Sequence, residues 1–86
     1  MLMDSDWEDI RHVAGLMGFD PIEFTAWLED QSLSGPVVGT IYIRRKSNKA
    51  ERSYRYDDSL INGDSAWAVA FGRDLAAGVF GVAKQP

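Results

Sequence analysis

Residues 65 to 80 read SAWAVAFGRDLAAGVF, and this stretch decides how the rest of the chain must fold. Trp67, Phe71 and Leu75 recur every four residues, so they lie along one stripe of a helix. Gly78 is suited to end that helix as a C-cap. Because a helix this apolar is normally covered by the rest of its domain, the residues upstream are expected to form its cover.

Length and composition favour one compact folded domain over residues 1–86. The chain has 86 residues, 45% of them hydrophobic, with three tryptophans and four phenylalanines, so one core without a stabilising metal or disulfide is feasible. There is no cysteine, which excludes disulfides and thiolate metal sites and makes a reducing, cytoplasmic setting the default. Neither a signal-peptide pattern nor an apolar run of membrane-spanning length is present, so no membrane partner is expected.

Charge is unevenly distributed along the chain. The formal net charge is −4, yet residues 36–56 hold six bases and one acid, whereas residues 1–35 hold eight acids and one base. The sequence therefore predicts an acidic protein with one basic projection. A protein that binds nucleic acid over its whole surface would usually be basic overall.

The first helix is predicted from about Asp6 to Met17. Ser5 and Glu8 have the spacing of a capping box, and apolar residues then follow at helical intervals. Gly18 is expected to end this helix.

A second helix is predicted from Asp20 to about Gln31. Asp20 can cap its start, Pro21 suits the first helical position, and Glu23 completes a capping box. Ile22 would then point away from the core.

Residues 37–45 and 50–57 are rich in β-branched residues and tyrosine, which predicts two antiparallel strands with a turn at 46–49. An isolated hairpin is not stable in water, so it must pack against the last helix. The fold class is α+β, in the order helix, helix, β-hairpin, helix. The predicted core consists of Trp7, Ile10, Val13, Met17, Phe19, Phe24, Trp27, Leu28, Ile41, Ile43, Trp67, Phe71 and Leu75.

Catalytic and metal chemistry finds little support in the residue types. His12 is the single histidine, and it falls on the polar face of the first helix without a nucleophile nearby. Two groups of acids come closest to a carboxylate site. The first consists of Asp4, Asp6 and Glu8, and the second of Asp57, Asp58 and Asp64. The first group lacks the glycine and the glutamate that a calcium loop needs, and the second is typical of turns and helix caps. We therefore expect no enzyme activity, no metal and no cofactor.

Two family patterns touch the first thirty residues. Residues 10–28 resemble a helix-turn-helix, which would make the basic hairpin the wing of a winged helix. However, Glu23, Glu29 and Asp30 in the would-be recognition helix would repel a phosphate backbone. Residues 16–19, LMGF, resemble the loop of ubiquitin-associated domains, which are three-helix bundles, whereas here a hairpin is predicted in place of the third helix.

The basic hairpin is the predicted partner-binding site. Its candidate residues are Tyr42, Arg44, Arg45, Lys46, Lys49, Arg52, Tyr54, Arg55 and Tyr56. One interpretation is a solvated hairpin tip whose charges keep an edge strand soluble. The other is a docking surface for an acidic partner, because arginine and tyrosine are common at interface hot spots and on stacking platforms.

The function predicted from the sequence is that of a non-enzymatic protein-binding module. An adaptor or a small inhibitor fits, for example an inhibitor of nucleic-acid-processing machinery whose acidic helices occupy a site meant for phosphates. The alternative is a winged-helix-like protein that contacts nucleic-acid phosphates through the basic hairpin. Another protein is thus the expected partner, with nucleic acid as the second possibility.

Overall fold

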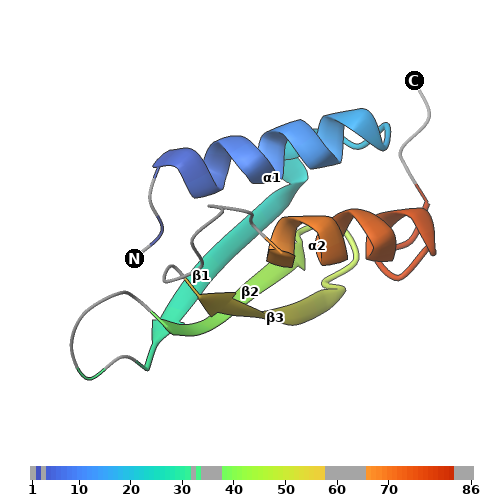
Figure 1. Ribbon diagram of the computed structural model, residues 1–86. Helices are drawn as coiled ribbons and strands as arrows, with labels where there is room; N and C mark the ends of the chain where they lie inside the picture. The colour runs from blue at the N-terminus through green and yellow to red at the C-terminus, as the bar shows by residue number, and fades with distance from the viewer. Residues whose placement is uncertain (1, 3, 32, 34–37, 58–65, 83–86) are drawn as a thin grey trace.

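The computed structural model describes residues 2, 4–31, 33, 38–57 and 66–82, and within these it has an α+β fold. A three-stranded antiparallel sheet is covered on one face by two helices (Figure 1). The elements are α1 (Asp4–Leu16), the short 3-10 helix η1 (Pro21–Glu23), β1 (Phe24–Asp30), β2 (Val38–Arg45), β3 (Glu51–Asp57) and α2 (Ala66–Ala76).

Both helices end where the sequence predicts, each at a glycine with a left-handed backbone. Gly18 has a φ of 82° and Gly78 a φ of 80°. After α1, the amide of Phe19 donates to the carbonyl of Ala14 at 2.9 Å. The same Schellman pattern follows α2, since it satisfies the last free carbonyls of each helix.

The second predicted helix is wrong beyond its first turn. Asp20 does cap the segment by accepting a hydrogen bond from the Ile22 amide at 3.1 Å, and Pro21 does open it. However, the helical part is only η1, and the chain continues as strand β1, which pairs with β2 from Phe24 to Asp30. Pairing with β2 satisfies the backbone of these residues in place of a helix, so tertiary context overrides the local start signal.

Strand β1 completes a sheet in which β2 is central. The predicted hairpin of β2 and β3 is confirmed, with Arg44 opposite Glu51 and Val38 opposite Asp57. β1 pairs along the other side of β2, so the hairpin has a neighbouring strand as well as a helix. Val37, the predicted start of the second strand, lies outside the described residues.

The core is built around α2, and its predicted stripe of Trp67, Phe71 and Leu75 is fully buried. The Phe71 ring meets Phe24 and Phe80 edge-on, with ring centroids 5.5 Å apart in both cases. Such edge-to-face contacts add to the stabilisation from burial. α2 is therefore the centre of the packing, with β1, β2, β3 and α1 around it.

The core prediction is wrong at two positions. Met17 is 40% exposed and Trp27 is 42% exposed. Met17 follows the last residue of α1, so it no longer lies on the buried stripe of that helix. Trp27 is placed on the outer face of β1, because side chains alternate along a strand and Phe24 already faces inward.

Candidate binding surfaces

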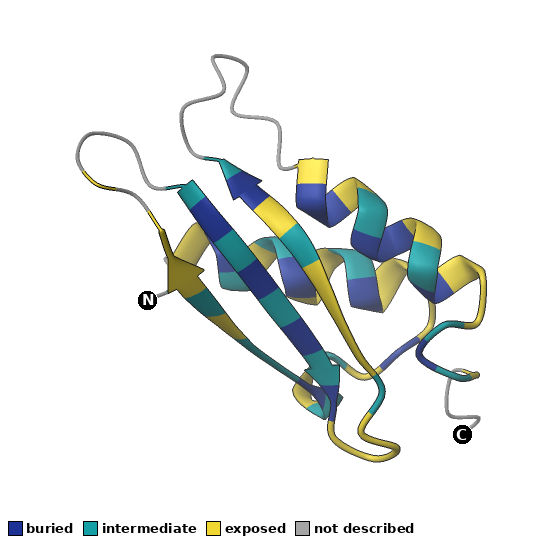
Figure 2. Cartoon of the chain, turned by 90° about the horizontal axis from the view of Figure 1, so that it is seen from below, coloured by how far each residue is buried: buried dark blue, intermediate teal, exposed yellow. Residues whose placement is uncertain are grey.

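The sheet has one face without helices. The helices lie together on the opposite side of the sheet, as the view from below makes clear (Figure 2). Ile41 and Ile43 point toward the helices and are buried, so their neighbours Tyr42 and Arg44 on β2 point to the open face. Tyr42 on the central strand has two cross-strand neighbours on this face. They are Trp27 of β1 on one side and Ser53 of β3 on the other.

An aromatic pair, the exposed Trp27 and the half-buried Tyr42, is the centre of this open face. The rings of Trp27 and Tyr42 stack with centroids 5.3 Å apart and planes only 10° from parallel. The Tyr42 hydroxyl donates to a Glu29 carboxylate oxygen at 3.5 Å, and the amide of Gln31 donates to the other oxygen at 3.2 Å. Tyr42 thus contacts an aromatic ring on one side and a carboxylate at its hydroxyl, while Trp27 stays exposed.

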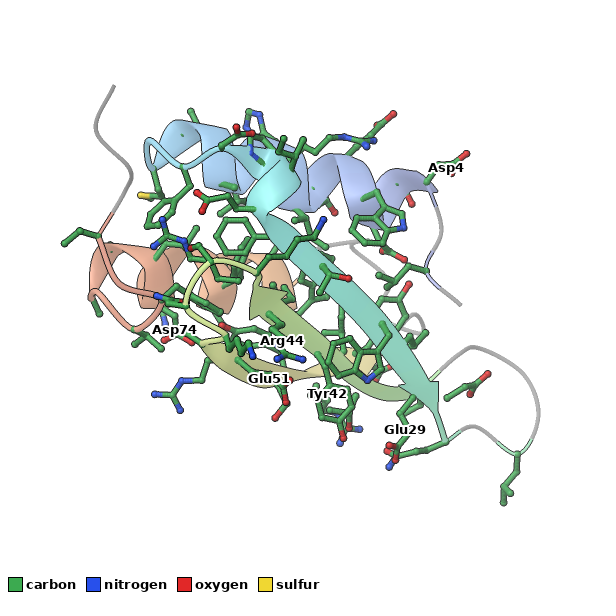
Figure 3. All side chains as sticks on the ribbon, turned by 180° about the vertical axis from the view of Figure 1, so that it is seen from behind. Asp4, Glu29, Tyr42, Arg44, Glu51 and Asp74 are labelled. Atoms are coloured by element: carbon green, nitrogen blue, oxygen red, sulfur yellow. The ribbon has the colours of Figure 1, made fainter. Side chains whose placement is uncertain are left out.

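Arg44 is the cation beside this aromatic pair, two residues along β2 from Tyr42 and on the same face. It is half-buried and makes no ion pair with the residues that the structure describes. Figure 3 shows Tyr42 and Arg44 side by side on the face away from α1, with Glu29 at one end and Glu51 at the other. We define the open-face site as Trp27, Glu29, Tyr42 and Arg44.

The nine predicted site residues do not form one surface. Three lie on the open side of the hairpin, Tyr42, Arg44 and Arg55, although Arg55 is 3.7 Å from the Asp57 carboxylate. Three exposed cations lie at or near the turn, Lys46, Lys49 and Arg52. The other three, Arg45, Tyr54 and Tyr56, face the helices.

The expectation that Arg45 is an exposed docking residue is wrong, because its side chain is buried and anchored. Its guanidinium donates to the carbonyls of Phe80 and Val82 at 2.9 and 2.8 Å and pairs with Glu23 at 3.2 Å. It also lies 4.8 Å from the centre of the Phe19 ring. Arg45 thus joins β2, η1 and the segment after α2.

Tyr54 and Tyr56 likewise serve the packing of helices on the sheet. The Tyr54 hydroxyl donates to Asp74 at 2.7 Å, and the Tyr56 hydroxyl donates to Asp6 at 3.0 Å. Burial raises the pKa of the Tyr54 phenol far above its ordinary value, and the hydrogen bond to Asp74 raises it further. Tyr56 is buried, so its placement on an exposed binding surface is wrong.

The two ends of the sheet differ in the charges that they carry. Glu29, Asp30 and Asp57 lie at the end of the sheet away from the β2–β3 turn, and the Asp6–Tyr56 hydrogen bond brings the acidic start of α1 to the same end. Lys46 and Lys49 lie at the opposite end, in the turn itself. Glu23 and Glu51 lie near this end as well, so the basic turn has acidic neighbours of its own.

A separate groove of about 340 Å³ lies between α1 and the start of β1. Trp7 and Ile10 of α1 and Ile22 and Phe24 across from them give it an apolar lining. Arg11 and Lys46 are the charged residues that line it. Ile22 points away from the core as predicted, but from η1 and not from a longer helix, so the groove beside it was not predicted.

The outward position of Trp27 was not predicted either, although the sequence contains a pattern that indicates it. Phe24, Ala26 and Leu28 alternate with Thr25, Trp27 and Glu29, which is the period of a strand. The helix start signal at Asp20 obscured that alternation. The same correction removes the helix-turn-helix and the likeness to ubiquitin-associated domains, because both need a second helix where β1 lies.

Within the described residues, no group of three or more metal-ligating side chains is found. Asp58 and Asp64, which the sequence analysis considered together with Asp57, lie outside those residues. None of the helices in the described part of the chain has the length and apolarity to cross a membrane.

Comparison of the chain with protein-family models, with curated proteins and with solved structures finds no match.

Proposed function

We propose that this protein is a non-enzymatic protein-binding module that docks through the open-face site. One observation carries the proposal: the helices cover one face of the sheet, and on the other face the exposed Trp27 stacks on the half-buried Tyr42, next to Arg44, which makes no ion pair with the described residues. Tryptophan, tyrosine and arginine are the residue types that most often dominate binding energy at interfaces.

The geometry also favours a preorganised contact. Trp27 and Tyr42 already stack on each other before a partner binds, which reduces the side-chain freedom lost on binding. The partner we propose is a protein surface with an apolar centre and a carboxylate that meets Arg44. The setting we propose is cytoplasmic, in keeping with the absence of cysteine from the sequence.

The proposal is tested by affinity capture with the tagged chain, followed by mass spectrometry, in which the partners of the wild type are compared with those of two variants. The wild type is compared with Trp27→Ala and with Val69→Ala, a matched loss of an exposed apolar side chain on α2. A hot-spot residue costs about 2 kcal/mol or more on truncation, which is roughly a thirtyfold loss of affinity. Partners of the open face should disappear with Trp27→Ala and remain with Val69→Ala.

Circular dichroism of both variants ensures that a lost partner reflects lost contact and not lost folding. If every specific partner of the wild type is retained equally by Trp27→Ala, the open face is not the docking surface and the proposal fails.

Binding of nucleic acid is the second candidate function. Lys46, Lys49 and Arg52 are exposed and make no ion pair with the described residues, so they are free to meet phosphates. A gel shift with random duplex and single-stranded pools at low salt separates the candidates, because phosphate attraction is strongest there. Retention of a pool by the wild type and its release by Lys46→Ser with Lys49→Ser would favour this candidate.

A further inference from the structure

We infer that the groove between α1 and the start of β1 is a second docking site, which binds a short acidic peptide segment of a partner. The segment would place an apolar side chain between Trp7 and Ile22 and carboxylates against Arg11 and Lys46. This site is separate from the open face, and the inference does not rest on the proposed function.

The apolar part of the argument is the exposure of Ile22. This side chain is 75% exposed and stands at the rim of a groove that Trp7 and Phe24 also line. Ile22 is held there by rigid backbone, because Pro21 fixes the entry to η1 and Asp20 caps it. A volume of about 340 Å³ accommodates a few side chains of a peptide and is at the low end for a small-molecule pocket.

The charge of the groove selects the occupant. Thirteen acids outnumber nine bases in the whole chain, yet both charged residues that line the groove are cations. Neither Arg11 nor Lys46 makes an ion pair with the described residues, so both remain available to carboxylates.

The two acids of the η1 segment, Asp20 and Glu23, contact groups other than these two cations. The Glu23 carboxylate pairs with Arg45 at 3.2 Å, and the Asp20 side chain accepts the Ile22 amide at 3.1 Å. Both acids of the η1 segment are therefore engaged elsewhere. An extended segment with acidic residues on either side of an apolar residue matches this pattern of charge and shape.

The three tryptophans make the test selective, because each occupies a different environment. Trp7 lines the groove, Trp27 is on the open face, and Trp67 is buried in the core. Their indole N–H signals in a ¹⁵N–¹H spectrum of the full chain therefore report on the groove, the open face and the fold separately. Each signal is assigned with a single Trp→Phe variant.

The probe is the synthetic peptide Glu-Glu-Leu-Phe-Glu-Glu, titrated at low salt. We expect the Trp7 signal to shift in a saturable manner while the Trp27 and Trp67 signals stay in place. Arg11→Glu combined with Lys46→Glu should weaken binding of this peptide by roughly tenfold or more, since attraction becomes repulsion. The same variant should gain binding of Lys-Lys-Leu-Phe-Lys-Lys.

Three results would overturn the inference. One is a Trp7 signal that does not move with the acidic peptide. Another is an equal response to Glu-Glu-Ser-Ser-Glu-Glu, which would reduce the effect to unspecific charge attraction. The third is a shift of Trp27 without Trp7, which would place the peptide on the open face and leave the proposed function standing.

Discussion

Arg45 shows how a single residue can look like a surface cation in sequence and act as a structural anchor. Its side chain is 6% exposed and links Glu23 to the carbonyls of Phe80 and Val82. Arg45→Met should lower the free energy of unfolding by roughly 3–5 kcal/mol, because it breaks a buried ion pair and removes the donor to two carbonyls. Urea denaturation followed by circular dichroism measures the loss.

Arg44 provides the matched control, since it is the next residue along β2 and points to the opposite face. Arg44→Met should change the unfolding free energy by less than about 0.5 kcal/mol. Equal effects of the two substitutions would show that the Arg45 contacts do not stabilise the fold.

Because of Tyr54, the free energy of unfolding should fall at alkaline pH. Its pKa is raised in the folded state by burial and by Asp74, so the neutral phenol is favoured by folding. The associated stability is fully present below the ordinary tyrosine pKa of about 10 and is lost as the pH rises above it. The urea midpoint of the wild type should therefore fall more between pH 8 and pH 10.5 than that of Tyr54→Phe. Parallel falls in both proteins would contradict the assignment.

Among the elements, the pairing of β1 with β2 depends on Gly39. A Cβ atom at this position would overlap the Glu29 carbonyl oxygen of the neighbouring strand, and a backbone atom cannot move aside cheaply. Gly39→Ala should destabilise the protein by more than about 1 kcal/mol through strain at this crossing. Gly15→Ala in α1 meets nothing within 4 Å and should stabilise by about 0.5–1 kcal/mol. Thermal melts of both variants decide the point, and a neutral Gly39→Ala would mean that the strands can separate locally.

The α2 helix organises the core through Phe71, which is fully buried between the rings of Phe24, Phe80 and Tyr54. Phe71→Ala should cost about 3–5 kcal/mol, because a cavity forms where no helix end can relax into it. Val69→Ala, on the exposed side of the same helix, should be nearly silent in chemical denaturation. An unchanged midpoint for Phe71→Ala would assign the stripe to an interface between chains and not to the core.

The same elements show how far sequence reasoning reaches. The α2 stripe, the β2–β3 hairpin and both glycine helix ends could be predicted, because each depends on a local pattern. β1 could not, because a genuine helix start at Asp20 and Pro21 precedes seven residues whose conformation is set by pairing with β2. The outward position of Ile22 was predicted correctly, whereas Trp27 was misplaced, because the outer face of β1 is known only once its pairing with β2 is known.

On the scale of the whole molecule, the one-sided architecture separates structural from accessible residues within a single hairpin. Alternate residues of β2 either pack under the helices or face solvent, so Arg45 and Arg44 have opposite roles although they are adjacent. The fold class and the covering of the hairpin by α2 followed from composition and periodicity. Which basic residues are buried and which are exposed could not be predicted in the same way, because that depends on the register of all three strands.

The anchoring of Arg45 by Phe80 and Val82 has a consequence for synthesis of the chain. While a ribosome has released only the part before these residues, the buried guanidinium lacks two of its acceptors and the Phe71 ring lacks a neighbour. Translation adds about 5–20 residues per second, so an incomplete domain remains exposed during that interval. Stalled nascent chains that have emerged through Val79 should be digested rapidly by protease, and those that have emerged through Val82 should resist it. The newborn domain thus resists protease only once the segment after α2 that holds Arg45 has emerged.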